Sequence, residues 1–307
     1  MNFIQTNKIE NLSIITYIKN HSNKSIYTIL ILKDKRISCT SDQNKIDIYN
    51  QTTFEINISI KINEKCLTNL NQLKDGNLII GTEKSIFIFG ILKFSYFVVF
   101  NINLKEFIHK IIELNNNNLI SCGKNSLILW ENHSIFKNFL DKKNYSKKIL
   151  LKKFDIFDAI EINKNEIVFK TFDFIIIWEI KSNKKLNQIK IKSSLSYSTF
   201  NKINKQILFF GAKENVYLID TIKKQILNFF PIKSSTMCSC LFNCNNFLFI
   251  LTGHSNGDFM QWKISNNQIS FVSFKLNAHK SYVNCLRQFN NNFIISCSSD
   301  SLIKIWQ

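Results

Sequence analysis

A repeated pattern of short apolar runs constrains the fold of this chain more than any other feature. Each copy has a run rich in Ile, Leu and Phe, a polar turn, and a second run ending in a large apolar residue. The clearest copy is Phe293-Ile-Ile-Ser-Cys-Ser-Ser-Asp-Ser-Leu-Ile-Lys-Ile-Trp306, and a close match runs from Arg36 to Tyr49. The copies end at intervals of 40 to 48 residues, at Tyr49, Phe89, Trp130, Trp178, Ile219, Trp262 and Trp306.

Seven copies at this period, each a set of short strands, resemble the WD-repeat (G-beta-like) family of β-propellers. The resemblance covers essentially the whole chain, and it is closest in the first and last copies. It implies an all-β fold: one domain over residues 1–307, a seven-bladed β-propeller of four-stranded antiparallel blades.

Asparagine-rich turns precede the signature strands. Hairpin turns need residues that tolerate positive φ, and Asn is the best substitute for Gly. The chain has only seven Gly, so we expect Asn to form many of its turns. The predicted turn segments are 33–35, 74–76, 115–118, 163–165, 204–205, 243–246 and 290–292.

The last copy needs a strand from elsewhere in the chain. It stops one residue after Trp306, so its blade lacks an outermost strand. Residues 1–24 precede the first blade and contain a strand-like run, Leu12 to Lys19. We expect residues 1–24 to complete the last blade, and this strand to close the ring and cover an edge that otherwise templates aggregation.

A hydrogen-bonded chain of side chains is implied by the resemblance. In WD repeats, a His before the first strand, a Ser or Thr in the second, an Asp in the tight turn and a Trp in the third are joined. The last blade offers His279, Ser296, Asp300 and Trp306. The first blade offers His21, Ser38 and Asp42, with Tyr49 in place of Trp.

Ser, His and Asp together are also the components of a hydrolase triad. Here the set recurs in two copies and ends in an indole donor, and no Gly-x-Ser-x-Gly elbow is present. A structural role therefore explains these residues better, and we expect no enzymatic activity.

The cysteines do not form a recognisable metal motif. Cys238, Cys240 and Cys244 alternate along a strand near His254, whereas zinc knuckles use Cys-x2-Cys pairs. We expect no metal and no cofactor. Cys39, Cys122 and Cys297 align with Gly81, Gly211 and Gly253 of other copies, at a site that favours a small residue.

The formal net charge of +18 is concentrated in certain segments. The longest spacing precedes the fourth blade, and we expect it to form an insertion that joins the outer strand of blade three to the inner strand of blade four. Lysines from this region are the candidate partner-binding residues: Lys142, Lys143, Lys147, Lys148, Lys152 and Lys153. A positive surface attracts RNA, anionic lipid or acidic proteins. Base-specific readout favours Arg, and the only arginines are Arg36 and Arg287.

The N-terminus has no signal-peptide pattern. The longest apolar stretch, Phe87 to Phe100, is too short for a spanning helix and predicts two strands with a turn. We expect a cytoplasmic protein, with a nuclear location as the alternative.

The functional prediction is a non-catalytic scaffold that presents rim loops to several partner proteins in a multiprotein complex. The alternative is an RNA- or ribonucleoprotein-associated propeller that contacts phosphates through lysine-rich loops of blades three to five. No membrane span and no small-molecule substrate are expected.

Overall fold

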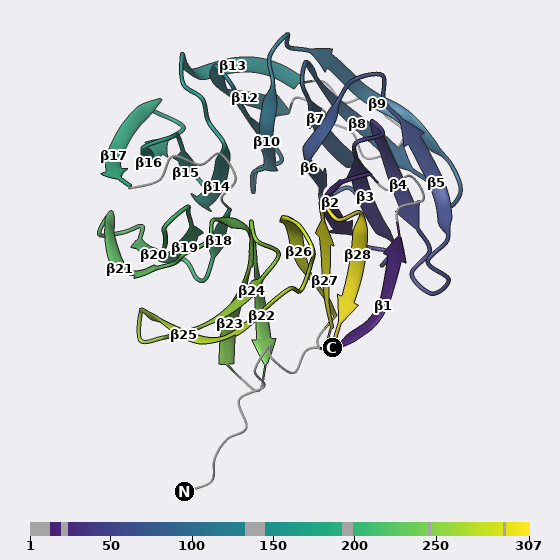
Figure 1. Cartoon of the computed structure of the whole chain (residues 1–307). Helices are drawn as coiled ribbons and strands as arrows, with labels where there is room; N and C mark the ends of the chain where they lie inside the picture. The colour runs from purple at the N-terminus through teal and green to yellow at the C-terminus, as the bar shows by residue number, and fades with distance from the viewer. Residues whose placement is uncertain (1–12, 20–23, 133–144, 192–198, 245–246, 291–292) are drawn as a thin grey trace, which may run out of the picture. The chain divides into compact units, whose positions relative to one another are not determined.

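The computed structural model describes residues 13–19, 24–132, 145–191, 199–244, 247–290 and 293–307. These residues form seven four-stranded antiparallel sheets and contain no helix (Figure 1). They divide into two compact units, Tyr27–Ser196 and Met1–Ile26 with Tyr197–Gln307.

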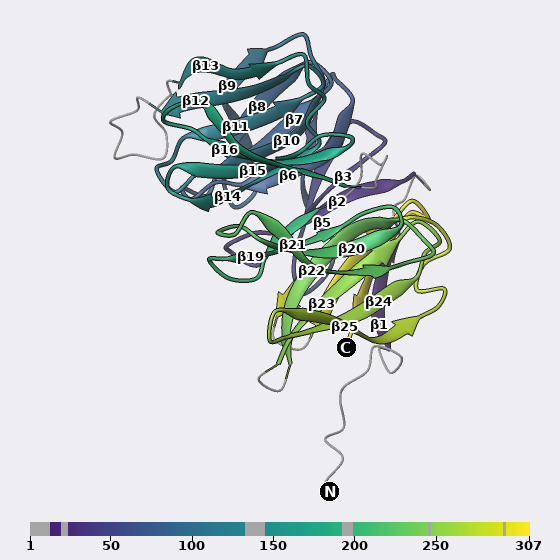
Figure 2. The same ribbon diagram turned by 90° about the vertical axis from the view of Figure 1, so that its left-hand side faces the viewer.

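The first unit holds four sheets, each built from four strands that follow one another in the chain (Figure 2). The first sheet has β2 (Ile26–Ile31), β3 (Ile37–Ser41), β4 (Lys45–Tyr49) and β5 (Ile56–Lys61). The second has β6 (Cys66–Gln72), β7 (Leu78–Thr82), β8 (Ser85–Ile91) and β9 (Tyr96–Asn103). The third has β10 (Ile108–Glu113), β11 (Leu119–Gly123), β12 (Ser126–Asn132) and β13 (Tyr145–Lys152). The fourth has β14 (Asp158–Asn163), β15 (Glu166–Lys170), β16 (Phe174–Glu179) and β17 (Lys184–Lys190).

The second unit holds three sheets. The fifth sheet has β18 (Phe200–Lys202), β19 (Ile207–Gly211), β20 (Asn215–Asp220) and β21 (Gln225–Pro231). The sixth has β22 (Thr236–Cys244), β23 (Phe247–His254), β24 (Phe259–Ser265) and β25 (Gln268–Lys275). The seventh has β26 (Val283–Asn290), β27 (Phe293–Ser298), β28 (Leu302–Trp306) and β1 (Ile14–Lys19).

The N-terminal strand β1 is the outermost strand of the seventh sheet. It runs antiparallel to β28, with Ile14 opposite Trp306 and Lys19 opposite Leu302. Backbone hydrogen bonds between Ser13 and Gln307, at 3.1 and 3.2 Å, extend this pairing. The strand that the last repeat lacks in sequence is therefore supplied from the other end of the chain.

In the first five sheets, exposure of the side chains increases from the second strand to the fourth. Strands β3, β7, β11 and β19 are buried at every position, whereas β13 and β17 are mostly exposed. Apolar clusters lie between successive sheets within each unit; one joins Leu129 and Leu150 of the third sheet to Phe169 of the fourth. The Ile, Leu and Phe runs of the repeat therefore face other sheets on both sides, which explains why they are nearly continuous.

Asparagine contributes to turns in two ways. It adopts positive φ at Asn44, Asn117 and Asn183, where Gly is otherwise favoured. Elsewhere its side chain caps a turn: Asn204 Oδ1 accepts hydrogen bonds from the backbone N–H of Gln206 and of Ile207, both at 2.8 Å.

The predicted fold class is confirmed: the protein is all-β, with seven four-stranded antiparallel blades of the β-propeller type. The apolar stretch Phe87–Phe100 falls on the β8–β9 hairpin, as predicted. No helix among the described residues is long and apolar enough to cross a membrane.

Candidate interaction site

Four side chains of the seventh blade form one buried hydrogen-bonded chain. Trp306 Nε1 donates to Ser296 Oγ at 2.8 Å. His279 Nε2 lies 2.7 Å from the same oxygen, and His279 Nδ1 lies 2.9 Å from Asp300 Oδ2. The structure thus brings His279, Ser296, Asp300 and Trp306 together.

The protonation states of this chain follow from its partners. Burial lowers the pKa of His279, although Asp300 opposes that shift. Burial also acts to raise the pKa of Asp300, but hydrogen bonds from His279 and from the backbone outweigh it and lower the pKa to about 2. A carboxylate can only accept, so a neutral His279 donates from Nδ1 and accepts from the Ser296 hydroxyl at Nε2.

Hydrogen bonds to turns fix the positions of Asp300 and His279. Asp300 also accepts from the backbone N–H groups of Lys280 and Leu302, at 3.0 and 3.1 Å, and so joins two loops. The backbone N–H of His279 donates to the carbonyl of Gly257 at 2.9 Å. Gly257 has a φ of +88°, and a Cβ there would lie 2.1 Å from the His279 carbonyl oxygen, so only Gly fits.

The geometry explains why these residues do not form a hydrolase site. Ser296 Oγ already accepts the indole N–H, and the Ser296 side chain has no exposed surface. A nucleophile must reach a substrate carbonyl, and Ser296 cannot do so. The chain instead satisfies buried polar groups and holds two loops in place.

Two further blades contain part of the same arrangement. Trp130 Nε1 donates to Ser121 Oγ, and Trp262 Nε1 donates to Thr252 Oγ1, both at 2.9 Å. In the sixth blade, His254 Nε2 lies 2.8 Å from Thr252 Oγ1, and His254 Nδ1 lies 3.1 Å from the Ser234 carbonyl oxygen. This role of His254 was not predicted from the sequence, where His254 stood out only by its nearness to the cysteines. The available signal was its spacing of two residues from Thr252, which places both side chains on one face of a strand.

The first blade departs from the pattern. Strand register places Ile37 opposite Tyr49, as Ile294 lies opposite Trp306, so Cys39 rather than Ser38 corresponds to Ser296. Cys39 Sγ accordingly lies 4.0 Å from the Tyr49 hydroxyl. The predicted alignment of Cys39 with Cys122 and Cys297 is therefore wrong, because Thr40 occupies that position in the first blade.

The remaining predicted residues of the first blade are not joined to this contact. Ser38 Oγ is buried and has no hydrogen-bond partner among the described residues. Asp42 is exposed and accepts a hydrogen bond from the Tyr27 hydroxyl. His21 lies outside the described residues.

The candidate lysines lie mainly on a strand rather than on a projecting loop. Lys147, Lys148 and Lys152 belong to β13, the outer strand of the third blade, and Lys153 follows it with a φ of 66°. The predicted insertion between the outer strand of blade three and the inner strand of blade four is therefore wrong. Residues Tyr145–Lys152 themselves form that outer strand, because apolar Leu150 and Leu151 favour pairing with β12. All four lysines are exposed, and Lys147 Nζ lies 5.9 Å from the centroid of a Trp130 ring. Lys142 and Lys143 lie outside the described residues.

A ladder of aromatic rings at the loop ends of the third and fourth blades is a feature that sequence analysis missed. Neighbouring ring centroids of Phe107, His109, Phe157 and Phe172 are separated by 4.7, 4.9 and 4.6 Å. His109 Nε2 lies 2.8 Å from Asp155 Oδ1. Burial lowers the pKa of His109, and Asp155 opposes that shift. The residues come from three loops or strand ends far apart in sequence, so no local motif announces them.

A buried lysine lies beneath the ladder. Lys170 ends β15, and its Nζ lies 5.7 Å from the centroid of the Phe157 ring. Burial lowers its pKa to about 8, and the charge of Asp158 partly opposes the shift.

Comparison with known protein families gives a match at the end of the chain, from β25 of the sixth blade to β28 of the seventh. Residues 270–307 match the family model described as WD domain, G-beta repeat. These residues include the complete His279–Ser296–Trp306 chain. None of the curated proteins compared matches the chain. No group of His, Cys, Asp and Glu among the described residues has the geometry of a metal site.

Proposed function

We propose that this WD-repeat β-propeller protein is a non-catalytic scaffold that binds several partner proteins through the loops at the ends of its blades. The WD-repeat fold itself suggests a protein-interaction scaffold. The observation that carries the proposal is the buried His279–Ser296–Trp306 chain, because it uses the chemistry of Ser and His to hold loops rather than to react. Loops held by a rigid framework bind partners with a small loss of conformational entropy.

The aromatic ladder is the strongest candidate for a partner-binding surface. Phe172 of the ladder is 45% exposed, and Phe154, which precedes Asp155 in the chain, is 46% exposed. Aromatic residues are enriched in the centres of protein interfaces. The contacts of Phe172 with Phe157 and of His109 with Asp155 restrict the conformations of these side chains before a partner binds.

The experiment is affinity purification of the tagged full-length protein from its native cell, followed by mass spectrometry. We expect a reproducible set of proteins with the wild type, and depletion of at least one in a Phe154→Ser/Phe172→Ser variant. The matched control is Phe274→Ser, an exposed Phe on the outer strand β25 of the sixth blade. Recovery of no specific protein would contradict the scaffold, and an unchanged set with the double variant would contradict this surface.

The second candidate function, RNA binding, is favoured by the exposed lysines of β13 and by Phe154, which follows them directly. Lysine contacts to phosphate release counterions, so binding weakens steeply as salt rises. We expect a fluorescent polyuridine RNA to bind with a salt dependence that is reduced in Lys147→Glu/Lys148→Glu. Lys61→Glu/Lys65→Glu, two exposed lysines at the end of the first blade and in the turn after it, is the matched control. Binding that does not depend on salt, or that both double variants weaken equally, argues against this function.

A further inference from the structure

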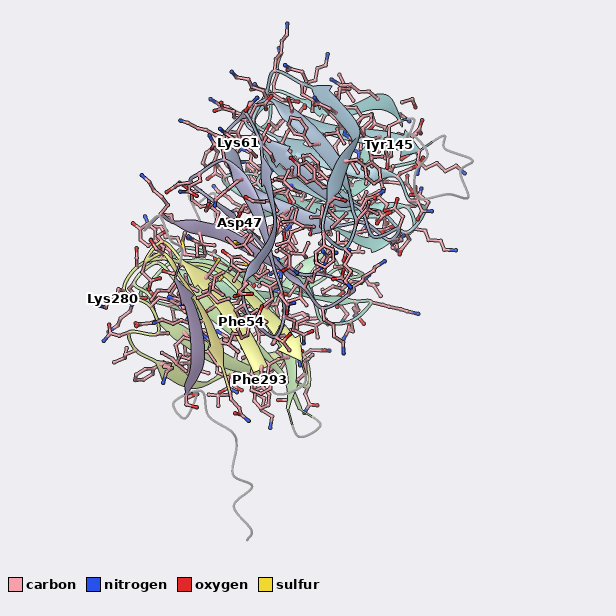
Figure 3. All side chains as sticks on the ribbon, turned by 90° about the vertical axis from the view of Figure 1, so that its right-hand side faces the viewer. Asp47, Phe54, Lys61, Tyr145, Lys280 and Phe293 are labelled. Atoms are coloured by element: carbon pink, nitrogen blue, oxygen red, sulfur yellow. The ribbon has the colours of Figure 1, made fainter. Side chains whose placement is uncertain are left out.

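The outer strand of the second blade, β9, lacks the protection found on the other outer strands. An exposed strand edge can pair with another chain, and proteins block it with Lys or Pro. Across the seven described sheets, β9 is the only outermost strand with neither residue. The others contain Lys61 in β5, three Lys each in β13 and β17, Pro231 in β21, Lys275 in β25 and Lys19 in β1 (Figure 3 labels Lys61).

An apolar stripe runs along the same strand and the turn before it. Tyr96 and Val98 of β9 are 39% and 57% exposed, and Leu92 and Phe94 in the turn before it are 46% and 68% exposed. Alternate positions on an extended strand lie on one face, so Tyr96 and Val98 share a face of β9. The sequence of β9 is Tyr-Phe-Val-Val-Phe-Asn-Ile-Asn, which has high β-propensity and no charge.

The turn that carries this stripe is held in place. Arg36 Nη1 donates to the carbonyl oxygens of Leu92 and Lys93, both at 3.1 Å. Arg36 is itself fixed by Asp34, with Nη2 and Oδ2 2.7 Å apart. One of the two arginines of the chain therefore holds the β8–β9 turn against the first blade.

The other face of β9 packs against its own unit. Val99 is buried, and the Phe100 ring meets the Tyr145 ring of β13 edge-on, with centroids 5.4 Å apart (Figure 3 labels Tyr145). Gly90 on β8 leaves room for the Phe97 ring, because a Cβ there would lie 2.2 Å from Phe97 Cζ. These contacts hold β9 on both sides of its register shift at Val99, so little conformational entropy is lost when an incoming chain pairs with it.

The charges at the two ends of β9 indicate which partner fits. Lys93 lies before the strand and Lys105 follows it, and both are exposed. Antiparallel pairing of β9 with β9 of a second copy would place Lys93 of each chain near Lys105 of the other. Like charges in such positions oppose pairing, so a strand with acidic ends is favoured over a second copy.

We propose that β9 is an acceptor edge for an extended segment of a partner protein, with alternating apolar side chains and acidic residues at both ends. The segment adds a strand to the second blade through backbone hydrogen bonds. Its apolar side chains cover the stripe Leu92, Phe94, Tyr96 and Val98. This surface is separate from the loop ends in the proposed function, so either can fail without the other.

The test uses the full chain and a fluorescent synthetic peptide in which Val and Thr alternate between pairs of Glu. We expect saturable binding, weakened by about tenfold or more in Val98→Lys, which places a charge on the exposed stripe. Ser270→Lys, at an exposed position of the outer strand β25, is the matched control and should bind like the wild type. Because Val98 is exposed, the variant should retain the far-UV circular dichroism of the wild type.

A second peptide separates strand addition from side-chain docking. N-methylation of alternate amides removes backbone donors and leaves the side chains unchanged, and we expect this peptide not to bind. Equal binding of the methylated peptide, no binding of the parent peptide, or equal weakening by the two Lys variants would overturn the proposal. A wild-type dimer in sedimentation velocity that becomes a monomer in Val98→Lys would overturn it too, because the occupant would then be a second copy.

Discussion

At the level of single residues, one buried hydroxyl organises the best-preserved blade. Ser296 Oγ accepts from Trp306 and donates to His279, whose imidazole is held by Asp300. Removal of one partner leaves the others buried without a hydrogen bond, which costs more than the bond itself contributes. Loss of either end residue of this hydrogen-bonded set, Asp300 or Trp306, should therefore destabilise the protein more than the position of Asp300 in a turn suggests.

Asp300→Ala should lower the free energy of unfolding by about 1–3 kcal/mol, because His279 and two backbone N–H groups lose their acceptor. Urea unfolding followed by tryptophan fluorescence measures this change. Asp42→Ala, at the corresponding turn of the first blade, is the control, and it should cost below about 0.5 kcal/mol since Asp42 is exposed. Equal losses in the two variants would show that the seventh-blade chain has no special role.

His254 should make stability depend on pH. Burial lowers its pKa from 6.5 to about 4, so between these values the unfolded chain takes up a proton that the folded chain does not. The free energy of unfolding is unaffected above pH 6.5 and falls as pH decreases toward 4, by up to about 3 kcal/mol.

The measurement is urea unfolding of the wild type and His254→Gln at pH 7 and at pH 5. Gln cannot be protonated, so the variant should lose less stability between the two pH values. His279 and His109 remain in both proteins and their lowered pKa values act in the same direction, so the difference between the proteins isolates His254. Identical pH dependence would count against a neutral, buried His254.

At the level of strands and sheets, the small residues of the second strands determine how closely neighbouring blades approach. A Cβ at Gly81 would lie 2.5 Å from Ile108 Cγ2 of the next blade, and one at Gly211 would lie 2.5 Å from Thr236 Cγ2. Strand register places Gly81 and Gly211 at the same position as Cys122 and Cys297. The position therefore receives the first strand of the following blade, and Cys serves as a small buried residue there.

Gly81→Ala should destabilise the protein by about 1–3 kcal/mol through the clash with Ile108. Ile108→Ala removes the Cγ2 atom, and the double variant should be more stable than the sum of the single losses predicts. A double-mutant cycle by thermal or urea unfolding gives this coupling energy. Additive losses would mean that the backbone shifts freely and that the position does not set the spacing.

For the molecule as a whole, the most consequential pairing joins the two ends of the chain. Strand β1 covers β28, which otherwise forms the open edge of the seventh blade. An uncovered edge invites pairing with other molecules. The positive charge also opposes association between molecules, because outer strands carry Lys147, Lys148, Lys184 and Lys185, which repel the same strands of a second molecule.

Deletion of residues 2–19 should cause aggregation or a large fall in the melting temperature, because it removes β1 and exposes β28. Deletion of residues 2–11, which keeps β1, is the control. Differential scanning fluorimetry and size-exclusion chromatography report the two effects. A deletion variant that remains a monomer with an unchanged melting temperature would refute the role of β1 in stability.

Much of this architecture was predictable because it depends on local and periodic patterns. Apolar runs at intervals of 40 to 48 residues define the seven blades, and Asn-rich segments mark turns, since both reflect the backbone preferences of short stretches. The members of the seventh-blade chain followed from resemblance of their spacing to a WD repeat.

Other features required three-dimensional contacts. The correspondence of Cys39, rather than Ser38, with Ser296 rests on strand register, because Ile37 pairs with Tyr49 as Ile294 pairs with Trp306. The position of β13 depends on pairing with β12, from which it is distant in sequence. The aromatic ladder depends on which sheets become neighbours, and the exposed edge of β9 depends on the order of strands in its sheet. Local sequence determines that a segment is a strand and which faces are apolar, whereas packing between distant segments determines which of those faces and edges stay open to a partner.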